Sequence, residues 1–285
     1  MRAFRTESAQ RPILARLTGR IAMLSLALLV AAMFLHRLFS IPTPVALNLL
    51  KLSILGGIAA IVIALLSLAS IWRHGGRGAG GTLSGMMLGI GLIGWPLLSL
   101  PQIEKFPEIN DVTTDTASPP PFVKLAAMRA ADANSPQHPG AAFASLQEEA
   151  YPDLKPLFVN RPVEEAYEIV ADALRRQKLV RVNEEPPGSD YPATGLIEAY
   201  DRTLVWGFFD DVAVRVTGNG QTSQIDLRSA SRYGRHDLGR NAERLRAILA
   251  EIVARLEATV SRERIERGTP QPDKGGKPAR QQRSR

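Results

Sequence analysis

Five aspartates in the segment after residue 101 are the side chains best suited to bind a cation. Carboxylate oxygens are the ligands that hard cations such as Mg²⁺ and Ca²⁺ prefer in proteins. None of the five has the spacing of a known cation-binding loop, and the four histidines are scattered. The structural alternative is that Asp237 caps a following helix and that the others begin strands or pair with bases. The five residues are Asp111, Asp115, Asp210, Asp211 and Asp237.

A second group of polar side chains could bind an anion near the start of the last predicted helix. Guanidinium donors beside a helix N-terminus suit a phosphate or a carboxylate. The alternative is that Arg228 pairs with an acid across the sheet, or holds down the segment 111–115. The candidate ligand or anion site consists of Arg228, Ser229, Ser231, Arg232, Asp237 and Asn241.

Several other chemistries have no support in the sequence. Cysteine is absent, which excludes disulfides, thiol catalysis and thiolate metal sites. The segment after residue 101 has no Gly-x-Ser-x-Gly elbow and no Rossmann or P-loop glycine pattern, and no cofactor is evident. Trp206, Phe208 and Phe209 form an aromatic cluster that could face a ligand pocket, the outer leaflet of a membrane or the core.

Three apolar runs precede this segment, at about 21–39, 52–72 and 82–100. Each is close to the roughly 20 residues that a helix needs to cross a bilayer. The first run could be a signal peptide, but His36-Arg37-Leu38-Phe39 follows it in place of a small-residue cleavage site. The sequence therefore favours an uncleaved anchor of three transmembrane helices in contact with the lipid bilayer.

The flanking charges predict the orientation of the anchor. The loop after the second run contains Arg73 and Arg77, whereas the loop after the first offers Arg37 and Lys51. The positive-inside rule then puts the N-terminus in the cytoplasm and everything after residue 100 outside, which is the periplasm in a Gram-negative bacterium. Five arginines precede the first run: Arg2, Arg5, Arg11, Arg16 and Arg20.

Two features inside the apolar runs have simple structural explanations. Lys51 is predicted at the outer end of the second helix, where its side chain can reach the interface. Gly85 and Gly89 form a small-xxx-small pair that lets helix backbones approach closely, within one bundle or in a dimer. The runs therefore indicate an anchor and not a transport pathway.

Periodicity after residue 101 predicts a two-layer α+β domain, with two helices against an antiparallel sheet. Helices are expected at 161–178 and 237–260, and a hairpin at 212–229 turns at Gly218-Asn219-Gly220, where positive φ would be tolerated. The proline-rich segment 106–121 is predicted to be a strap across the domain surface. Four regions follow: a cytoplasmic segment 1–20, the anchor 21–101, the domain 102–260 and a disordered basic tail 261–285.

Three stretches of this domain resemble the bacterial and plastid family called domain of unknown function 1499. They are residues 110–115 (NDVTTD) followed by a proline pair, residues 207–211 (GFFDD) and residues 226–241 (DLRSASRYGRHDLGRN). The resemblance covers roughly residues 103–257. It implies that membrane-anchored relatives exist, and it implies no particular activity.

Two functions remain open from the sequence. The first is a non-enzymatic, membrane-tethered domain that binds an envelope protein or a small ligand. The second is an envelope enzyme, such as a metal-dependent hydrolase, that uses the aspartates. No nucleic acid is expected as a partner, because the formal charge of +7 comes from the flanks and the tail. Unpaired carboxylates in one open pocket would favour the enzyme, and mutual salt bridges would favour the binding domain.

Overall fold

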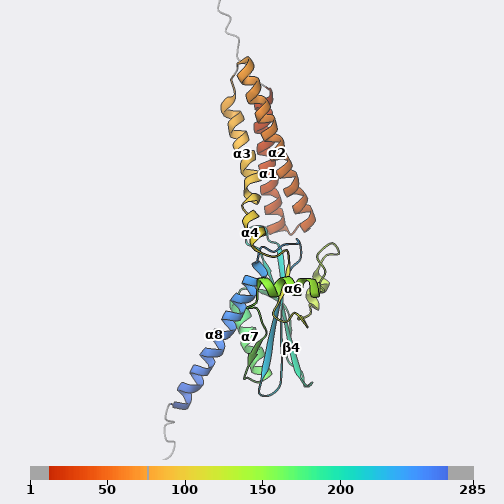
Figure 1. The fold of residues 1–285 in the computed structure, drawn as a ribbon, viewed down its shortest axis with the longest axis vertical. Coiled ribbons are helices and arrows are strands. Elements are labelled where there is room, and N and C mark those ends of the chain that lie inside the picture. Colours follow the sequence, from red (N-terminus) through yellow and green to blue (C-terminus); the bar gives the residue numbers. More distant parts are fainter. Residues whose placement is uncertain (1–12, 76, 269–285) are drawn as a thin grey trace, which may run out of the picture.

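The computed structural model describes residues 13–75 and 77–268 of the chain. A long helical bundle lies at one end and a mixed domain at the other, joined by a short connection (Figure 1). The N-terminal segment 1–12 and the residues 269–285 of the predicted tail lie outside the described residues.

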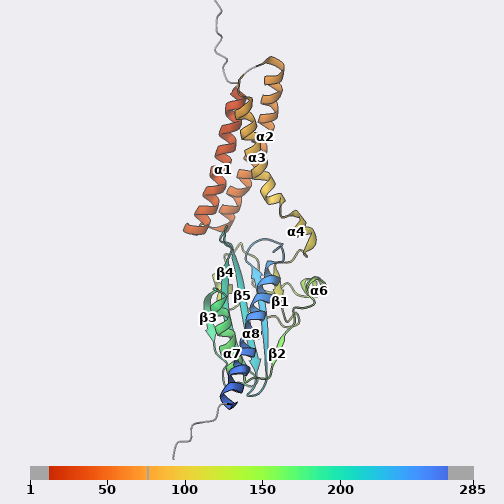
Figure 2. The ribbon, with the colours of Figure 1, turned by 90° about the vertical axis from the view of Figure 1, so that its left-hand side faces the viewer.

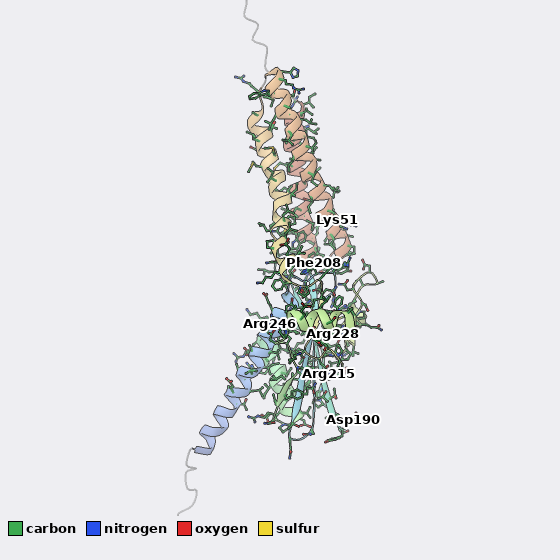
Figure 3. All side chains as sticks on the ribbon, viewed as in Figure 1. Lys51, Asp190, Phe208, Arg215, Arg228 and Arg246 are labelled. Carbon is green, nitrogen blue, oxygen red and sulfur yellow. The ribbon has the colours of Figure 1, made fainter. Side chains whose placement is uncertain are left out.

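Three helices form the bundle: α1 (Ile13–Phe39), α2 (Thr43–His74) and α3 (Ala79–Leu97). Each is long and apolar enough to cross a membrane, as the sequence predicted. Helices α1 and α2 begin earlier than their apolar runs, because Arg16 and Arg20 lie in the first turns of α1 and Lys51 interrupts the apolar residues of α2. Lys51 consequently lies about two turns inside α2, where its side chain is exposed (Figure 3).

Small residues set the spacing of the bundle helices. A Cβ atom on Gly89 would lie 2.8 Å from the carbonyl oxygen of Gly57 in α2, and one on Gly85 would lie 2.7 Å from Cγ2 of Thr18 in α1. Both glycines therefore serve contacts within one chain. A Cβ on Gly91 or Gly94 would meet no atom within 4 Å.

The short helix α4 (Leu100–Lys105) leads from the bundle into a six-stranded antiparallel sheet (Figure 2). The strand order is β1-β6-β5-β4-β3, and β2 also pairs with β6. The first two strands along the chain have three residues each, and the other four are longer. The strands are β1 (Asp111–Thr113), β2 (Leu157–Val159), β3 (Val180–Glu185), β4 (Ala193–Arg202), β5 (Phe209–Gly218) and β6 (Ser223–Ser231).

Helices α7 (Val163–Arg176) and α8 (Arg240–Gly268) cover one face of the sheet, and the apolar side chains between them form the main core. This confirms the predicted arrangement of two helices on an antiparallel sheet. Helix α8 continues past residue 260, where the sequence placed the start of the tail. Leu174, Leu245 and Ile252 from the helices pack there against Val214 and Leu227 from the sheet.

The segment 114–135, which includes the short helix α5 (Lys124–Met128), covers the opposite face. Phe122 and Leu125 pack there on Leu196, Ala213 and Ala230. The predicted surface strap therefore has to be corrected at its start, because Asp111–Thr113 is a buried strand paired with β6. A helix α6 (Ala141–Ala150) follows, and its Gln147 bonds the backbone of Thr113 through both amide atoms.

The predicted hairpin is β5 and β6, but its turn differs from the expectation. No residue of Gly218-Asn219-Gly220 has a positive φ. Asn219 instead closes the turn by accepting hydrogen bonds at Oδ1 from the backbone N–H groups of Gln221 and Thr222. Gly218 is needed for close approach, because a Cβ there would lie 2.8 Å from Cα of Ser223.

Candidate functional site

Arg228 and Asp111 form a buried ion pair between β6 and β1. Arg228 donates from Nε to Oδ1 of Asp111 at 3.0 Å and from Nη2 to Oδ2 at 2.7 Å. Its guanidinium also donates to the carbonyl oxygens of Pro120 and Pro136 and lies 4.3 Å above the ring of Phe122. Arg228 thus holds β1 and the covering segment together, which was one of the alternatives left open by the sequence.

Asp211 is fully buried and lies between two arginines on the same face of the sheet. Its carboxylate accepts a hydrogen bond from Nε of Arg129 at 2.8 Å and one from Nε of Arg232 at 2.9 Å. The Arg232 guanidinium also lies 5.0 Å from the ring centre of Phe209. Asp211 therefore connects β5 to the covering segment and to the residue that follows β6.

Asp115 shares a partner with Asp226 further along the sheet. Arg215 donates from Nη2 to Oδ2 of Asp115 at 3.1 Å and to Oδ2 of Asp226 at 2.9 Å. The same nitrogen donates to the carbonyl oxygen of Ser118 at 2.7 Å. Asp115 is thereby bound to the sheet and is not free to ligate a cation.

A separate polar network lies on the face covered by α8. Arg244 donates to Oδ2 of Asp210 at 2.7 Å and to Oδ1 of Asn241 at 2.8 Å. The hydroxyl of Ser229 donates to Oδ1 of Asn241 at 2.8 Å, and the Asn241 amide donates to Oγ of Ser231 at 3.1 Å. These contacts attach the first turn of α8 to β5 and β6.

Asp237 caps the start of α8, as the structural reading of the sequence proposed. Its carboxylate accepts from the backbone N–H of Gly239 at 2.8 Å and from that of Asn241 at 3.0 Å. Burial raises the pKa of Asp237 above its ordinary value, and the two N–H groups oppose this rise. The carboxylate is therefore occupied by the backbone of its own helix.

The sheet separates the residues of the predicted anion site. Successive residues of a strand point to opposite faces. Arg228 and Arg232 therefore contact Pro120 and Met128 of the covering segment, whereas Ser229 and Ser231 contact Asn241 of α8. The predicted cation ligands are separated in the same way, with Asp210 on the α8 side. Among the described residues, no group of three or more His, Asp or Glu side chains is placed to hold a metal ion.

Glu198 is a buried site residue that the sequence analysis did not identify. Its carboxylate accepts hydrogen bonds from the backbone N–H groups of Val123, Lys124 and Leu125, at 2.7 to 3.1 Å, and from the amide of Asn183. It therefore stabilises the start of α5 from strand β4. The signal available in the sequence was a lone acid inside the apolar run 195–200.

A small hollow of about 190 Å³ lies beside β1, and two unpartnered nitrogen atoms lie in this part of the domain. Asn110, Asp111, Arg129 and Asn134 contribute to its lining. Nη2 of Arg129 and Nε2 of His138 are buried without a hydrogen-bond partner. Burial lowers the pKa of His138 and that of Arg129.

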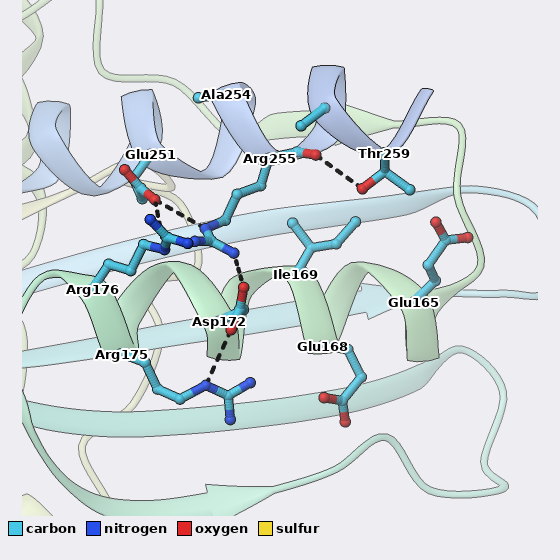
Figure 4. A pocket seen from close by; sticks show the side chains of 11 residues that line it. Glu165, Glu168, Ile169, Asp172, Arg175, Arg176, Glu251, Ala254, Arg255 and Thr259 are labelled. Carbon is cyan, nitrogen blue, oxygen red and sulfur yellow. Dashed lines mark hydrogen bonds and ion pairs between the residues drawn. The ribbon is translucent and has the colours of Figure 1, made fainter. Parts of the chain in front are cut away.

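A larger groove of about 650 Å³ runs between α7 and α8, and several of its charged side chains form ion pairs, within each helix and across the groove (Figure 4). Arg255 bonds both Asp172 and Glu251, and Arg175 bonds the other side of Asp172. Such exposed ion pairs mainly keep two helices in register and contribute little to stability.

The distal end of the domain, away from the bundle, has a hollow of a different character. Figure 3 places Asp190, the neighbour of Tyr191, at this end. The hollow has a volume of about 430 Å³ and contains no charged residue. Its lining includes Phe158, Tyr191, Asn160, Asn219, Thr222 and Gln224. The aromatic side chains are largely exposed, 70% for Phe158 and 85% for Tyr191.

The aromatic cluster of the sequence is divided between two environments at the opposite, bundle-facing end. The Trp206 ring stacks between Trp95 of α3, at 5.9 Å, and Phe208, at 5.6 Å. Phe208 also contacts His36 of α1, at 5.2 Å between ring centres. Phe209 points back to Tyr200 in the domain. Trp206 and Phe208 therefore join the domain to the bundle.

Comparison with known proteins gives one finding. Residues 111–252 match the family model described as "Protein of unknown function (DUF1499)". The matched range begins at β1 and ends within α8, so it contains the whole sheet, the segment that covers one face, and on the other face α7 with the first part of α8. No curated protein and no solved structure matches the chain.

Proposed function

Residues 111–252 belong to the DUF1499 family, and from that premise we propose that this membrane-anchored chain presents a non-enzymatic binding domain on the non-cytoplasmic side of a cell membrane. The N-terminus then lies in the cytoplasm. In a Gram-negative bacterium the membrane is the inner one and the domain faces the periplasm.

The observation that carries the proposal is the state of the candidate carboxylates. Asp111, Asp115, Asp210 and Asp211 each bond an arginine, and Asp237 bonds two backbone N–H groups. A catalytic acid or a metal ligand needs lone pairs that substrate or metal can reach. Paired carboxylates under a covering layer favour a structural role for these residues, and the open surfaces of the domain remain for binding.

The distal hollow is the surface that best suits a ligand. Two exposed aromatic rings offer apolar faces, and amide and hydroxyl groups beside them can donate and accept hydrogen bonds without any charge. A neutral, hydroxyl-rich ligand such as an oligosaccharide has matching faces and partners. We propose this ligand class for the hollow.

Binding is tested with the full chain in detergent and a neutral N-acetylglucosamine oligomer as the probe, followed by saturation-transfer NMR. We expect transfer to the sugar that falls at least tenfold in Tyr191→Ala and is unchanged in Trp72→Ala, which removes an aromatic side chain of the bundle that does not line the hollow. Transfer that is absent, or equal in both variants, overturns the ligand class.

Orientation is tested separately, with a C-terminal reporter that fluoresces only in the cytoplasm. We expect a dark fusion, because the five arginines before the first apolar run together with Arg73 and Arg77 outnumber the two basic residues that flank the loop after α1, Arg37 and Lys51. A bright fusion overturns the non-cytoplasmic placement and leaves the ligand test untouched.

Metal binding distinguishes the binding domain from the alternative, a metal-dependent hydrolase. Thermal unfolding of the full chain with Mg²⁺, Mn²⁺, Ca²⁺ or Zn²⁺ should not change if the carboxylates are already engaged. A rise in Tm with one of these ions that disappears in Asp211→Asn would support the enzyme in place of the binding domain.

A further inference from the structure

The loop between β4 and β5 ends in two exposed apolar side chains. Leu204 is 85% exposed and Val205 is 51% exposed. The loop is closed by its own backbone, because the N–H of Thr203 donates to the carbonyl of Phe208 and the N–H of Gly207 donates to that of Thr203. Its tip is therefore a defined structure that displays leucine and valine to the surroundings.

The back of this loop is attached to the bundle. The carbonyl oxygen of Trp206 accepts a hydrogen bond from His36, and Nη2 of Arg202 donates to the carbonyl oxygen of Arg37 at 3.2 Å. Figure 3 shows Phe208 at the end of the bundle that faces the domain. The tip residues Leu204 and Val205 accordingly lie beside the ends of helices that are apolar enough to span a membrane.

Other exposed apolar side chains lie at the end of the bundle that faces the domain. They belong to the last turn of α1, to the residue after α3 and to α4, and they are Leu38, Phe39, Leu98, Leu100 and Ile103. The outward face of a transmembrane helix is apolar because lipid covers it. The loop tip displays two more exposed apolar side chains at this end of the bundle.

We propose that Leu204 and Val205 insert into the leaflet that faces the domain, so that the β4–β5 loop is a membrane-contact element. Two apolar side chains next to the interface gain by leaving water for the boundary between headgroups and acyl chains. Lipid is the occupant that the position supports, because the loop is hydrogen-bonded to the domain-facing end of α1, a helix apolar enough to span a membrane.

The test uses the absence of cysteine from the natural sequence. Leu204→Cys carries an environment-sensitive nitrobenzoxadiazole label on the full chain in nanodiscs of phosphatidylethanolamine and phosphatidylglycerol. The control is Tyr191→Cys with the same label, equally exposed but at the distal end. Val205→Cys is a second variant, in case the first substitution disturbs folding.

We expect blue-shifted emission at 204 and 205, and quenching by nitroxide-labelled lipid that is at least threefold stronger than at 191. Emission at both loop positions like that at 191 overturns the proposal. Blue-shifted emission without quenching by the lipid nitroxide also overturns it, because a protein surface, including a second copy of this chain, would then cover the loop.

Discussion

His36 in the last turn of α1 donates a hydrogen bond from Nδ1 to the backbone carbonyl of Trp206, at 2.6 Å, across 170 residues of chain. Its Nε2 lies 3.0 Å from the hydroxyl of Thr43 at the start of α2. A single buried ring therefore bonds two bundle helices and the domain loop at once.

Removing this ring should loosen the junction without unfolding either part. His36→Ala removes the hydrogen bond to Trp206, and such a bond stabilises a fold by about 0.5–1.5 kcal/mol. Opening of the loop then becomes easier, so amide hydrogen exchange of Gly207 and Phe208 should accelerate by up to about tenfold. His74→Ala is the control, because His74 is exposed and bonds only its own helix at Ser70. Unchanged exchange at both amides would show that His36 does not hold the loop.

Replacing only one partner of the Asp111–Arg228 pair should strongly destabilise the domain. Asp111→Asn leaves a buried guanidinium without its counter-charge, which costs about 3–5 kcal/mol. Thermal unfolding of the full chain in detergent measures the loss. Asp153→Asn, which breaks the exposed pair with Arg246 (Figure 3), should cost about 1 kcal/mol or less. Equal losses in the two variants would contradict the buried role of Arg228.

The bundle should tolerate a methyl group at Gly94 and not at Gly89. A Cβ on Gly89 meets the backbone of α2, which cannot move aside, so Gly89→Ala should destabilise the bundle by about 1–3 kcal/mol. Gly94→Ala has open space and should stay within about 1 kcal/mol of the natural protein. Resistance of the helices to unfolding in dodecyl sulfate measures the difference, and equal resistance would refute close packing of α2 and α3.

Stability should fall on acidification through the pKa of His138. Burial lowers the pKa of this side chain in the folded chain below its ordinary value of about 6.5. On acidification, the unfolded chain therefore binds a proton at His138 at a higher pH than the folded chain does. The stability that neutral His138 contributes is present above pH 6.5 and is lost as the pH falls below that value. Between pH 7.5 and 5.5 the Tm should fall less in His138→Gln than in the natural protein. His74→Gln should follow the natural profile, and parallel profiles for all three would exclude His138 as the cause.

Local patterns predicted most of the elements. The apolar runs predicted the three bundle helices, and the alternation of Val212, Val214 and Val216 with Ala213 and Arg215 predicted the hairpin. Arg228 was also considered as a partner for an acid in the segment 111–115. These features depend on residues close in sequence or on a charge that must be paired when buried.

Long-range pairings were not predictable in the same way. The sequence segment 106–121 contains prolines and few apolar residues, so nothing in it marks the three-residue strand β1, which exists because β6 offers a free edge. Glu198 and Val123 are 75 positions apart, and His36 and Trp206 are 170 apart. Such contacts depend on strand order and on how the bundle meets the sheet. Neither produces a periodic pattern of apolar residues from which it could be predicted.

The attachment of the β4–β5 loop to the bundle determines how far the distal hollow lies from the membrane. The strands β4 and β5 run from the loop at the membrane end to the hollow at the far end (Figure 2). The length of these strands then sets the distance between the bilayer and the hollow that we propose as a ligand site. A ligand bound at Phe158 and Tyr191, as proposed, would be held at that distance, because hydrogen bonds from His36 to Trp206 and from Arg202 to Arg37 attach the membrane-facing end of the strands to α1.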